Sequence, residues 1–316
     1  MFWGNIEKVI VAPMENLPFD WKAHSGRSRI FAEIGFGNGE FMEYLARSNP
    51  DVLVVGIEVS QWCSAKAARR VMEAGLDNVR IMHGDARFLL RSTFAPESVE
   101  HVFMNFPCPW PKQRHAQRRV TVPAFTGLIE YLVEPGGAFD LATDVEWYAE
   151  EAAAAFRANS AFITDDIVIN PKRPYITKYE RKWKAMGKDT WQLTVHKAAV
   201  KQSDDVTKML YREENWNMEC DAVTAKSVAE TVDLLKDKEG TGVGGVGHWI
   251  FRDAFVSDSG VALMLVVTSD EGFEQHFYLK FVKNPRGITV KVDSVGHPYR
   301  TPAMRAAILA ALDAAK

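Results

Sequence analysis

The amino-terminal half of this chain folds around the stretch Ile30-Phe31-Ala32-Glu33-Ile34-Gly35-Phe36-Gly37-Asn38-Gly39-Glu40. An apolar run leads into an acid, three glycines follow at alternate positions, and a helical pattern begins directly after them. The stretch therefore predicts a strand, a tight turn and the first turn of a helix. Glycines let a ligand approach the backbone, and free N–H groups at a helix start attract its polar groups. We expect this loop to bind a nucleotide-like cofactor through Gly35, Gly37 and Gly39.

Apolar runs and helical patterns alternate through the rest of this half. Strands are expected at residues 53–57, 79–82, 99–105 and 138–143, and helices at residues 60–74 and 122–133. Such alternation predicts an α/β fold with a doubly wound, mostly parallel sheet. In sheets of this kind, ligands bind at the carboxyl ends of the strands.

Polar side chains stand at those expected strand ends. They are Glu33, Glu58, Asp85 and Asn105. An acid about twenty residues after the glycine loop can accept both hydroxyls of a ribose, which fits either NAD or S-adenosylmethionine. The glycines lack the dinucleotide spacing, and Glu33 would repel a pyrophosphate but attract a cationic amino group, so S-adenosylmethionine is favoured. Asp85 is then placed to accept from an adenine amino group. The alternative is that these acids only cap helices and turns.

Two clusters of cations suggest a nucleic-acid partner. The first has no Asp or Glu between residues 101 and 129 and contains Lys112, Arg114, His115, Arg118 and Arg119. The second, at residues 170–188, has Glu180 as its one acid and contains Lys172, Arg173, Lys178, Arg181, Lys182, Lys184 and Lys188. Aromatic residues lie among the cations: Trp110, Tyr175, Tyr179 and Trp183. Cations bind phosphates and aromatic rings stack on bases, so this composition favours a nucleic-acid interface. The alternative interpretation is that the two clusters are solvated charged faces.

The composition sets limits on the class of protein. With 316 residues, 47% of them hydrophobic, the chain has material for one large and one smaller domain. A net charge of −3 excludes a uniformly basic nucleic-acid binder. The cysteines lack metal-ligand spacing, and the sequence shows neither a signal peptide nor an apolar run long enough to cross a membrane. We expect a soluble cytoplasmic protein that has no membrane partner.

A second, smaller α+β domain is expected at residues 201–316, after a first domain at residues 1–200. Residues 201–239 are acid-rich and helical in pattern, and the glycine-rich residues 240–247 lack the Lys-Ser/Thr pair of a phosphate loop, so they are interpreted as a linker. Strand-like runs follow at residues 249–256, 261–268, 276–282 and 288–295, and a last helix begins at Thr301-Pro302. Met304, Ile308, Leu309 and Leu312 are expected to face the resulting antiparallel sheet. No catalytic constellation is visible here.

Five motifs together resemble one known family. They are Glu33-Ile34-Gly35-Phe36-Gly37-Asn38-Gly39, Gly56-Ile57-Glu58-Val59, Phe106-Pro107-Cys108-Pro109-Trp110, Ala142-Thr143-Asp144 and Thr177-Lys178-Tyr179-Glu180. Their order and spacing resemble the bacterial tRNA (guanine-N7-)-methyltransferases, in a long form with a carboxyl-terminal extension. The resemblance covers about residues 31–197. It implies a Rossmann-like, class I methyltransferase fold, S-adenosylmethionine as cofactor with S-adenosylhomocysteine as product, no metal, and methylation of a guanine N7 in the variable loop of tRNA. A monomer or a homodimer is compatible with it.

The resemblance also implies roles for individual residues. Cofactor contacts fall on Glu33, Glu58 and Asp85, with the glycines and Asn105 beside them. Substrate contacts fall on Lys112, Asp144, Thr177, Lys178, Tyr179 and Glu180, and Arg114 and Arg118 are expected to join them. Asp144, Asn105 and the position of Cys108 are the candidate catalytic residues. Cys108 departs from the family, which usually has Asp there.

Guanine N7 has a free lone pair, so methyl transfer can proceed mainly by alignment and exclusion of water. Asp144 or Glu180 can accept from N1 and N2 of guanine, which favours guanine over adenine. The alternative for Asp144 is an N-cap of the next helix, and for Cys108 a neutral loop replacement, since no covalent step is required.

Three other functions remain open at this stage. The chain could methylate an exocyclic base nitrogen, because Asn105-Phe106-Pro107 faintly resembles the loop of such enzymes. It could bind tRNA without turnover because of Cys108. An NAD-dependent oxidoreductase is the third possibility, and Glu33 argues against it.

Overall fold

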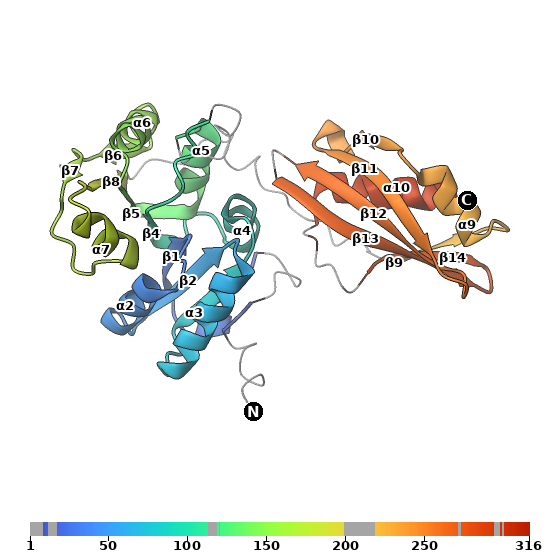
Figure 1. The fold of residues 1–316 in the computed structure, drawn as a ribbon, viewed down its shortest axis with the longest axis horizontal. Helices are drawn as coiled ribbons and strands as arrows, with labels where there is room; N and C mark the ends of the chain where they lie inside the picture. Colours follow the sequence, from blue (N-terminus) through green and yellow to red (C-terminus); the bar gives the residue numbers. More distant parts are fainter. Residues whose placement is uncertain are drawn as a thin grey trace. The chain divides into compact units, whose positions relative to one another are not determined.

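A computed structural model describes residues 9–11, 18–112, 119, 121–198, 219–270, 273–293, 298 and 300–316. The chain divides into two compact units, Met1–Tyr211 and Arg212–Lys316 (Figure 1). No helix in these described ranges is both long and apolar enough to cross a membrane.

The first unit is built on an eight-stranded sheet. Its strands are β1 (Arg29–Ile34), β2 (Val52–Glu58), β3 (Val79–His83), β4 (Val99–Asn105), β5 (Val133–Thr143), β6 (Phe162–Thr164), β7 (Val168–Ile169) and β8 (Trp191–Lys197). The order is β3-β2-β1-β4-β5-β8-β6, and β7 also pairs with β8. The first five strands in this order are parallel, and β8 runs antiparallel to β5. The expected doubly wound, mostly parallel sheet is therefore confirmed.

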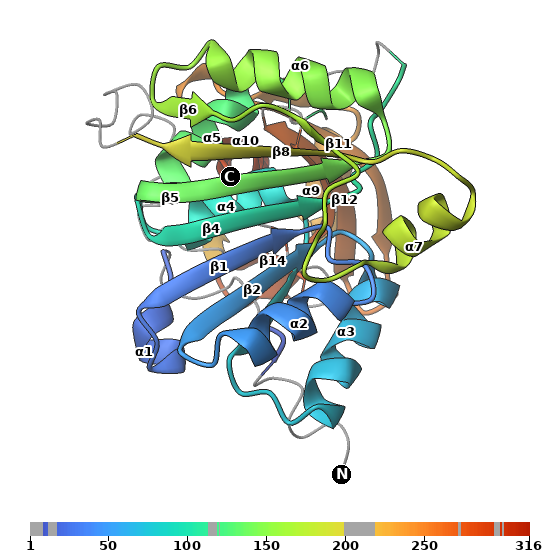
Figure 2. The same ribbon diagram turned by 90° about the vertical axis from the view of Figure 1, so that its left-hand side faces the viewer.

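Helices cover both faces of this sheet. The helices of this unit are α1 (Trp21–Ser25), α2 (Glu40–Ser48), α3 (Gln61–Glu73), α4 (Ala86–Thr93), α5 (Pro123–Leu132), α6 (Glu146–Arg157) and α7 (Lys178–Ala185). Figure 2 shows α2 and α3 in front of the sheet and α4 and α5 behind it. The strands are buried between these layers, and β2 has no exposed side chain from Val52 to Ile57. Continuous apolar runs such as this one are what a strand covered on both faces requires.

Strand β5 begins earlier than expected. The sequence predicts a helix up to residue 133 and a strand from residue 138, but the Pro135-Gly136-Gly137 segment between them lies inside β5. Gly137 explains this, because a Cβ atom there would lie 2.5 Å from the Glu100 carbonyl oxygen of the neighbouring strand. Glycine thus allows close backbone approach at this point in the sheet.

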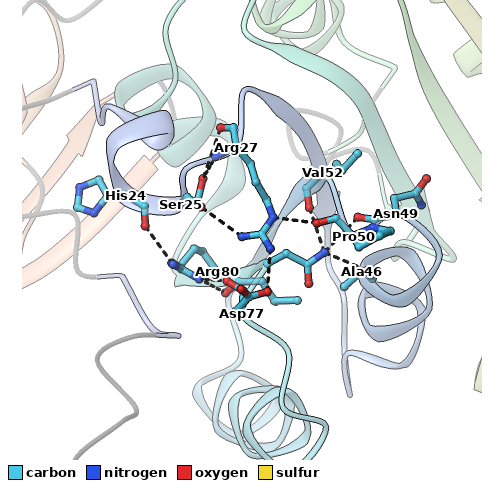
Figure 3. Close-up of polar contacts among 11 residues, drawn as sticks. His24, Ser25, Arg27, Ala46, Asn49, Pro50, Val52, Asp77 and Arg80 are labelled. Atoms are coloured by element: carbon cyan, nitrogen blue, oxygen red, sulfur yellow. Dashed lines mark hydrogen bonds and ion pairs between the residues drawn. The ribbon is translucent and has the colours of Figure 1, made fainter.

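The loops at the amino ends of β1, β2 and β3 are tied together by polar contacts (Figure 3). Arg27 donates from Nε to the Pro50 carbonyl (2.9 Å) and pairs with Asp77 (2.8 Å). The buried Asn78 amide donates to the carbonyls of Ala46, Asn49 and Val52 at 2.9–3.1 Å. These contacts fix the edge of the sheet opposite the carboxyl ends of the parallel strands.

The second unit is a six-stranded antiparallel sheet with two α-helices packed on one face. Its elements are β9 (Glu219–Val223), α9 (Val228–Leu235), β10 (Glu239–Thr241), η3 (Val243–Gly245), β11 (His248–Val256), β12 (Val261–Asp270), β13 (Phe273–Asn284), β14 (Gly287–Val292) and α10 (Pro302–Ala315). The order is β10-β11-β12-β13-β14-β9. Apolar side chains from β11, β12 and β13 form a core with both helices. The smaller α+β unit agrees with the expected fold class.

Two expectations for this unit are wrong. The glycine-rich residues 240–247 are not a linker, because Gly240 lies in β10 and packs so closely on Trp249 that a Cβ atom would lie 2.6 Å from the ring. Leu309 does not face the sheet, since 49% of it is exposed; small residues of α10, such as Ala307 and Ala311, are buried instead. Of the acid-rich segment at 201–239, residues 201–218 lie outside the described residues, and the remainder contains strand β9 as well as helix α9.

Candidate active site

The carboxyl ends of β1, β2 and β4 bring three of the expected residues together. Asn105, at the end of β4, donates from Nδ2 to Oε1 of Glu33 in β1 at 3.3 Å. Glu58, at the end of β2, accepts from the backbone N–H groups of Gly37 (3.1 Å) and Ser60 (3.0 Å). The carboxylate of Glu58 therefore shapes the glycine loop, and one edge of the sheet presents two acids and an amide.

The glycine loop adopts a backbone that other residues rarely take. Gly35, Gly37 and Gly39 have φ angles of 72°, 56° and 73°. At Gly39 there is also no room for a side chain, because a Cβ atom would lie 2.8 Å from that of Ala67. Glycine is required here both for the left-handed backbone and for the close packing of α2 on α3.

Glu33 is a buried acid with spare hydrogen-bonding capacity. Only 2% of the residue is exposed, and Oε2 lacks a hydrogen bond of normal geometry to any described residue. Burial raises the pKa of Glu33 to about 8, although the Asn105 hydrogen bond and the charge of Arg173 act in the opposite direction. Such an oxygen fits a ligand that brings a cationic donor, because a cation would stabilise the ionised carboxylate.

Asp85 has the capping role that was considered as an alternative. It is the N-cap of α4, accepts from the backbone N–H of Arg87 at 2.8 Å, and pairs with the Arg87 guanidinium at 2.6 Å. The structure therefore places Asp85 after β3 as expected, with its carboxylate engaged locally.

Helix α7 carries the expected substrate motif, and its central acid is fully buried. Glu180 pairs with Arg173 at 3.1 Å and with Lys184 at 2.8 Å. Thr177 is the N-cap of α7, since its hydroxyl accepts from the Glu180 backbone N–H at 3.2 Å. Arg173 also donates to Oδ1 of Asn105, so α7 is connected to the end of β4.

Sequence reasoning missed the role of Arg173. It was counted as one more phosphate-binding cation, but its side chain is only 8% exposed and contacts protein groups. A signal was present, because Glu180 is the one acid among the cations of residues 170–188, and a buried acid needs a partner.

Asp144 lies directly after β5 and is half-buried. Its side chain makes no hydrogen bond to any residue in the part of the chain that the structure describes. The N-cap position of α6 is occupied by Val145, so the capping alternative for Asp144 is wrong. Strand β5 pairs with β4 through Ala142 and Asn105, so the Asp144 carboxylate follows the same edge of the sheet, and no described residue occupies it.

The loop after β4 is held in an uncommon conformation. Phe106 and Trp110 have φ angles of 52° and 47°, and the Phe106 N–H donates to the Ala142 carbonyl at 2.7 Å. Cys108 and Lys112 are exposed. Non-glycine residues with positive φ are sparsely populated and cluster at functional sites.

The first cation cluster is only partly available to a ligand. Arg119 donates to the carbonyls of Trp110 (3.1 Å) and Pro111 (3.3 Å), so it supports the loop. Arg114 and Arg118 lie outside the described residues, as does His115.

The cations of the second cluster, at residues 170–188, also fall into two groups: some contact protein groups and others are exposed. Arg181 pairs with Glu40 at 2.7 Å, and the ammonium groups of Lys182 and Lys188 lie over the Trp183 ring. Lys172, Lys178 and Tyr179 are exposed, and neither lysine has an ion pair with a described residue. These side chains are the ones free to contact phosphates or bases.

Comparisons with known proteins place the chain among methyltransferases. A sequence family described as "Putative methyltransferase" matches residues 27–193. The chain is similar to a tRNA (guanine-N(7)-)-methyltransferase of Thermotoga maritima, with 40% identity over 91% of this chain and 90% of the relative. It is 32% identical to the protein of the same name from Thermus thermophilus, over 90% of this chain and 88% of the relative.

Other matches cover less of the chain. The protein of that name from Nitrosococcus oceani is 39% identical over 51% of this chain and 68% of its own length. Among solved structures, the 16S rRNA methyltransferase KamB has 15% identity and a TM-score of 0.45, over 57% of this chain and 94% of that chain.

Proposed function

Because this chain belongs to the tRNA (guanine-N(7)-)-methyltransferase family, we propose that it methylates N7 of a guanine in the variable loop of tRNA. The enzyme is a class I, S-adenosylmethionine-dependent methyltransferase that acts on guanine N7 in tRNA. The variable loop is the finer part of the proposal and rests on the resemblance of the motifs. The observation that supports methyl transfer to tRNA at this site is the chain of contacts from Glu33 through Asn105 and Arg173 to Glu180. These contacts join the proposed cofactor edge of the sheet to the basic helix α7.

The residues at the strand ends fit S-adenosylmethionine. This cofactor supplies a methyl group on a sulfonium sulfur, and its amino group is cationic. We assign the free Oε2 of Glu33 to that amino group, because the oxygen is buried without a normal hydrogen bond. Glu58 is assigned to the ribose and Asp85 to the adenine amino group, with Gly35, Gly37 and Gly39 beside the cofactor.

No described residue has to remove a proton from the attacking atom, because guanine N7 already carries a lone pair. The contribution of the protein is alignment and exclusion of water. We assign Asp144 to accept from N1 and N2 of guanine, because Glu180 already pairs with two cations. Asn105 positions groups on the cofactor side, and Cys108 is an exposed loop residue without a covalent step.

The tRNA backbone is assigned to the exposed cations. Lys112, Lys172 and Lys178 are available for phosphates, and Tyr179 offers an exposed ring for stacking. Thr177 contributes indirectly by capping α7. Arg114 and Arg118, in the same cation cluster as Lys112, complete the proposed tRNA contacts. Because tRNA is its substrate, we also propose that the enzyme acts in the cytoplasm, as a monomer or a homodimer.

A labelled transfer assay tests the function directly. Purified protein is incubated with methyl-labelled S-adenosylmethionine and unmodified tRNA, the RNA is digested, and the labelled nucleoside is identified and mapped. We expect N7-methylguanosine in the variable loop, and no label in a tRNA whose variable-loop guanines are replaced by adenine. Label on an exocyclic nitrogen, or in another loop, would overturn the proposal.

The same assay examines Cys108. Cys108→Ala is expected to retain the activity of the natural protein, because an exposed thiol is not needed for the chemistry. If the natural protein binds tRNA but transfers no methyl group, and Cys108→Asp does transfer it, the cysteine has abolished turnover and the proposed function is wrong for this chain.

A further inference from the structure

The guanidinium group of Arg173 connects the end of strand β4 to helix α7. Arg173 comes from the loop between β7 and α7; it donates from Nη2 to Oδ1 of Asn105 and pairs through Nη1 with Glu180 at 3.1 Å. Asn105 donates in turn to Glu33, the buried acid at the end of β1. A continuous chain of polar contacts therefore joins Glu33 to helix α7.

The surroundings of Arg173 make this placement costly. Its side chain is 8% exposed, and its guanidinium carbon lies 5.6 Å from the ring centre of Phe41 and 5.9 Å from that of Phe106. Burial lowers the pKa of Arg173, although Glu180 counteracts the effect. A buried ion pair is often no more stabilising than apolar side chains of similar volume. The need for a cation here is therefore explained better by the site than by folding stability.

The segment between β7 and β8, which contains α7, is held in place by other contacts as well. At its base, Asn170 donates from its backbone to the Thr190 carbonyl (2.8 Å) and from its side chain to Asp189 (2.6 Å). On the outside, Arg181 pairs with Glu40 at 2.7 Å. Within the part of the chain that the structure describes, neither anchor has a hydrogen bond or an ion pair with Asn105 or Glu33.

We propose that Arg173 is a positioning residue that sets α7 and Glu180 against Asn105 and Glu33, so that the tRNA side and the cofactor side of the site share one geometry. This inference rests on the proposed function, because it assigns the two sides to tRNA and to S-adenosylmethionine. A shift of about 1 Å in aligned reactants can cost about 100-fold in rate. Holding both sides with a single planar group limits such shifts, since the guanidinium fixes two partners in one plane.

Arg173 also influences the charge of the cofactor edge. The groups that face Glu33 are Asn105 from β4, Glu58 from β2, the backbone of Met42 in α2, and Arg173. The positive charge of Arg173 favours the ionised carboxylate, so its removal raises the pKa of Glu33 above about 8. A cationic ligand group binds the ionised form of Glu33. Without the charge of Arg173, a larger fraction of Glu33 is protonated at a given pH, so the protein must release more protons when the cofactor binds.

Three variants separate position, charge and stability. Arg173→Lys keeps the charge but loses the planar group that fixes two partners, and Arg173→Gln loses the charge. Lys197→Met is the control for loss of a buried cation, because Lys197 pairs with Glu97 at 3.0 Å and bonds the Val133 carbonyl near the start of β5. Each protein is titrated calorimetrically with S-adenosylmethionine in two buffers of different ionisation enthalpy, and kcat and KM for tRNA are measured.

We expect Arg173→Gln to lower kcat about 100-fold. At the wild-type pKa of Glu33 the variant should release more protons than the natural protein on binding the cofactor, by up to about 0.5 proton. Titration of the ligand amino group contributes equally to both proteins and cancels in this difference. Arg173→Lys should keep the proton release of the natural protein while its kcat stays low. Lys197→Met should lower the melting temperature and leave proton release unchanged.

The inference is overturned if Arg173→Gln keeps the natural kcat and proton release, or if Arg173→Lys restores full activity. It is also overturned if Lys197→Met alters proton release as much as Arg173→Gln does. Cofactor titration needs no tRNA, so a failure of tRNA methylation in the natural protein would count against the proposed function. The effect of Arg173 on Glu33 would then still be measured.

Discussion

At the scale of single residues, Glu33 shows a conflict between folding and binding. An apolar residue would fill the end of β1 without the cost of burying a carboxyl group, yet the sequence has an acid whose second oxygen lacks a normal hydrogen bond. The free protein accommodates this by favouring the protonated form. The proposed contact with a cationic ligand group explains this position, and burying the acid should lower the stability of the free protein.

Glu33→Gln is expected to stabilise the free protein at neutral and alkaline pH. The pKa of Glu33 rises from 4.5 to about 8 on folding, so the folded state binds more protons than the unfolded state between these values. Stability is therefore lost as the pH rises through this window, by at most about 3 kcal/mol at about pH 7. The amide does not ionise, so the variant should lack this slope when chemical denaturation is followed across the window. Glu73→Gln, at an exposed ion pair with Arg69, serves as the control.

A flat pH difference between Glu33→Gln and the natural protein would show that Glu33 is ionised throughout in the free protein. The same variant should bind S-adenosylmethionine more weakly, because a neutral amide replaces the carboxylate. Greater stability combined with weaker binding is the expected signature of a ligand-binding acid.

Asn78 gives the opposite case, a buried polar residue that serves folding alone. Its amide donates to the carbonyls of Ala46 in α2, Asn49 in the following turn and Val52 in β2. Figure 3 labels these three acceptors. Asn78→Ala should destabilise the first unit by about 1–3 kcal/mol, because these buried acceptors lose their donor. Asn78→Asp should be worse, since a carboxylate would face the same carbonyls. Denaturant unfolding measures the loss.

Since Asn78 lies at the amino ends of the strands, the cofactor affinity of Asn78→Ala should equal that of the natural protein at temperatures where the variant is folded. A large change in affinity without a change in stability would contradict this assignment.

At the scale of elements, helix α7 depends on its first residue. Thr177 is 8% exposed and caps the helix through the N–H of Glu180, the same residue that pairs with Arg173. Thr177→Ala should cost about 1 kcal/mol of helix stability and lower kcat for tRNA, while cofactor affinity stays unchanged. Thr177→Ser should restore activity, because its hydroxyl can accept the same hydrogen bond. The readouts are thermal unfolding and steady-state kinetics.

Ser227→Ala is the matched control for loss of an N-cap. Ser227 caps α9 in the second unit, with Glu230 completing a capping box. Its loss should lower stability by a similar amount and leave kcat unaltered. If Thr177→Ala lost stability but kept full activity, Thr177 would be a cap without influence on the site.

Some helices and strands could be predicted from the sequence alone, and others could not. The glycine loop, the parallel strands and the last helix follow from local patterns, because apolar periodicity and the residues at helix ends depend on near neighbours. The interpretation of residues 240–247 as a linker failed because glycine has two uses. It permits free motion in a linker, and it also permits the close contact that Gly240 makes with Trp249. Only the partner across the sheet distinguishes them.

The site was predictable to a similar extent. The strand-end residues Glu33, Glu58 and Asn105 could be expected together, because parallel strands end at one edge. The lone acid Glu180 indicated that some cation must pair with it, but the contact of Arg173 with Asn105 could not be predicted, since the two residues are 68 positions apart in the sequence. Charge counting groups all cations together, and burial separates those that bind protein from those that remain for RNA.

At the scale of the whole molecule, the two units have separate cores. The match to the methyltransferase family ends at residue 193, inside the first unit. The second unit has its own buried cluster, including Phe251, Met264 and Phe277. The relatives from Thermotoga maritima and Thermus thermophilus match over both parts, whereas the match to the Nitrosococcus oceani protein covers 51% of this chain. We therefore expect the proposed catalytic chemistry to lie in the first unit.

The second unit should therefore fold on its own. A fragment of residues 212–316 is expected to unfold in one cooperative transition, because a six-stranded sheet with two helices on one face buries a complete core. In the full chain, Met264→Ala should lower the transition of this unit by about 2–5 kcal/mol and leave cofactor affinity unchanged. Leu53→Ala, from the fully buried β2, should do the reverse and weaken the cofactor-binding unit. Calorimetric unfolding of the fragment and of both variants tests this. A fragment without a cooperative transition would mean that the sheet depends on the first unit for its fold.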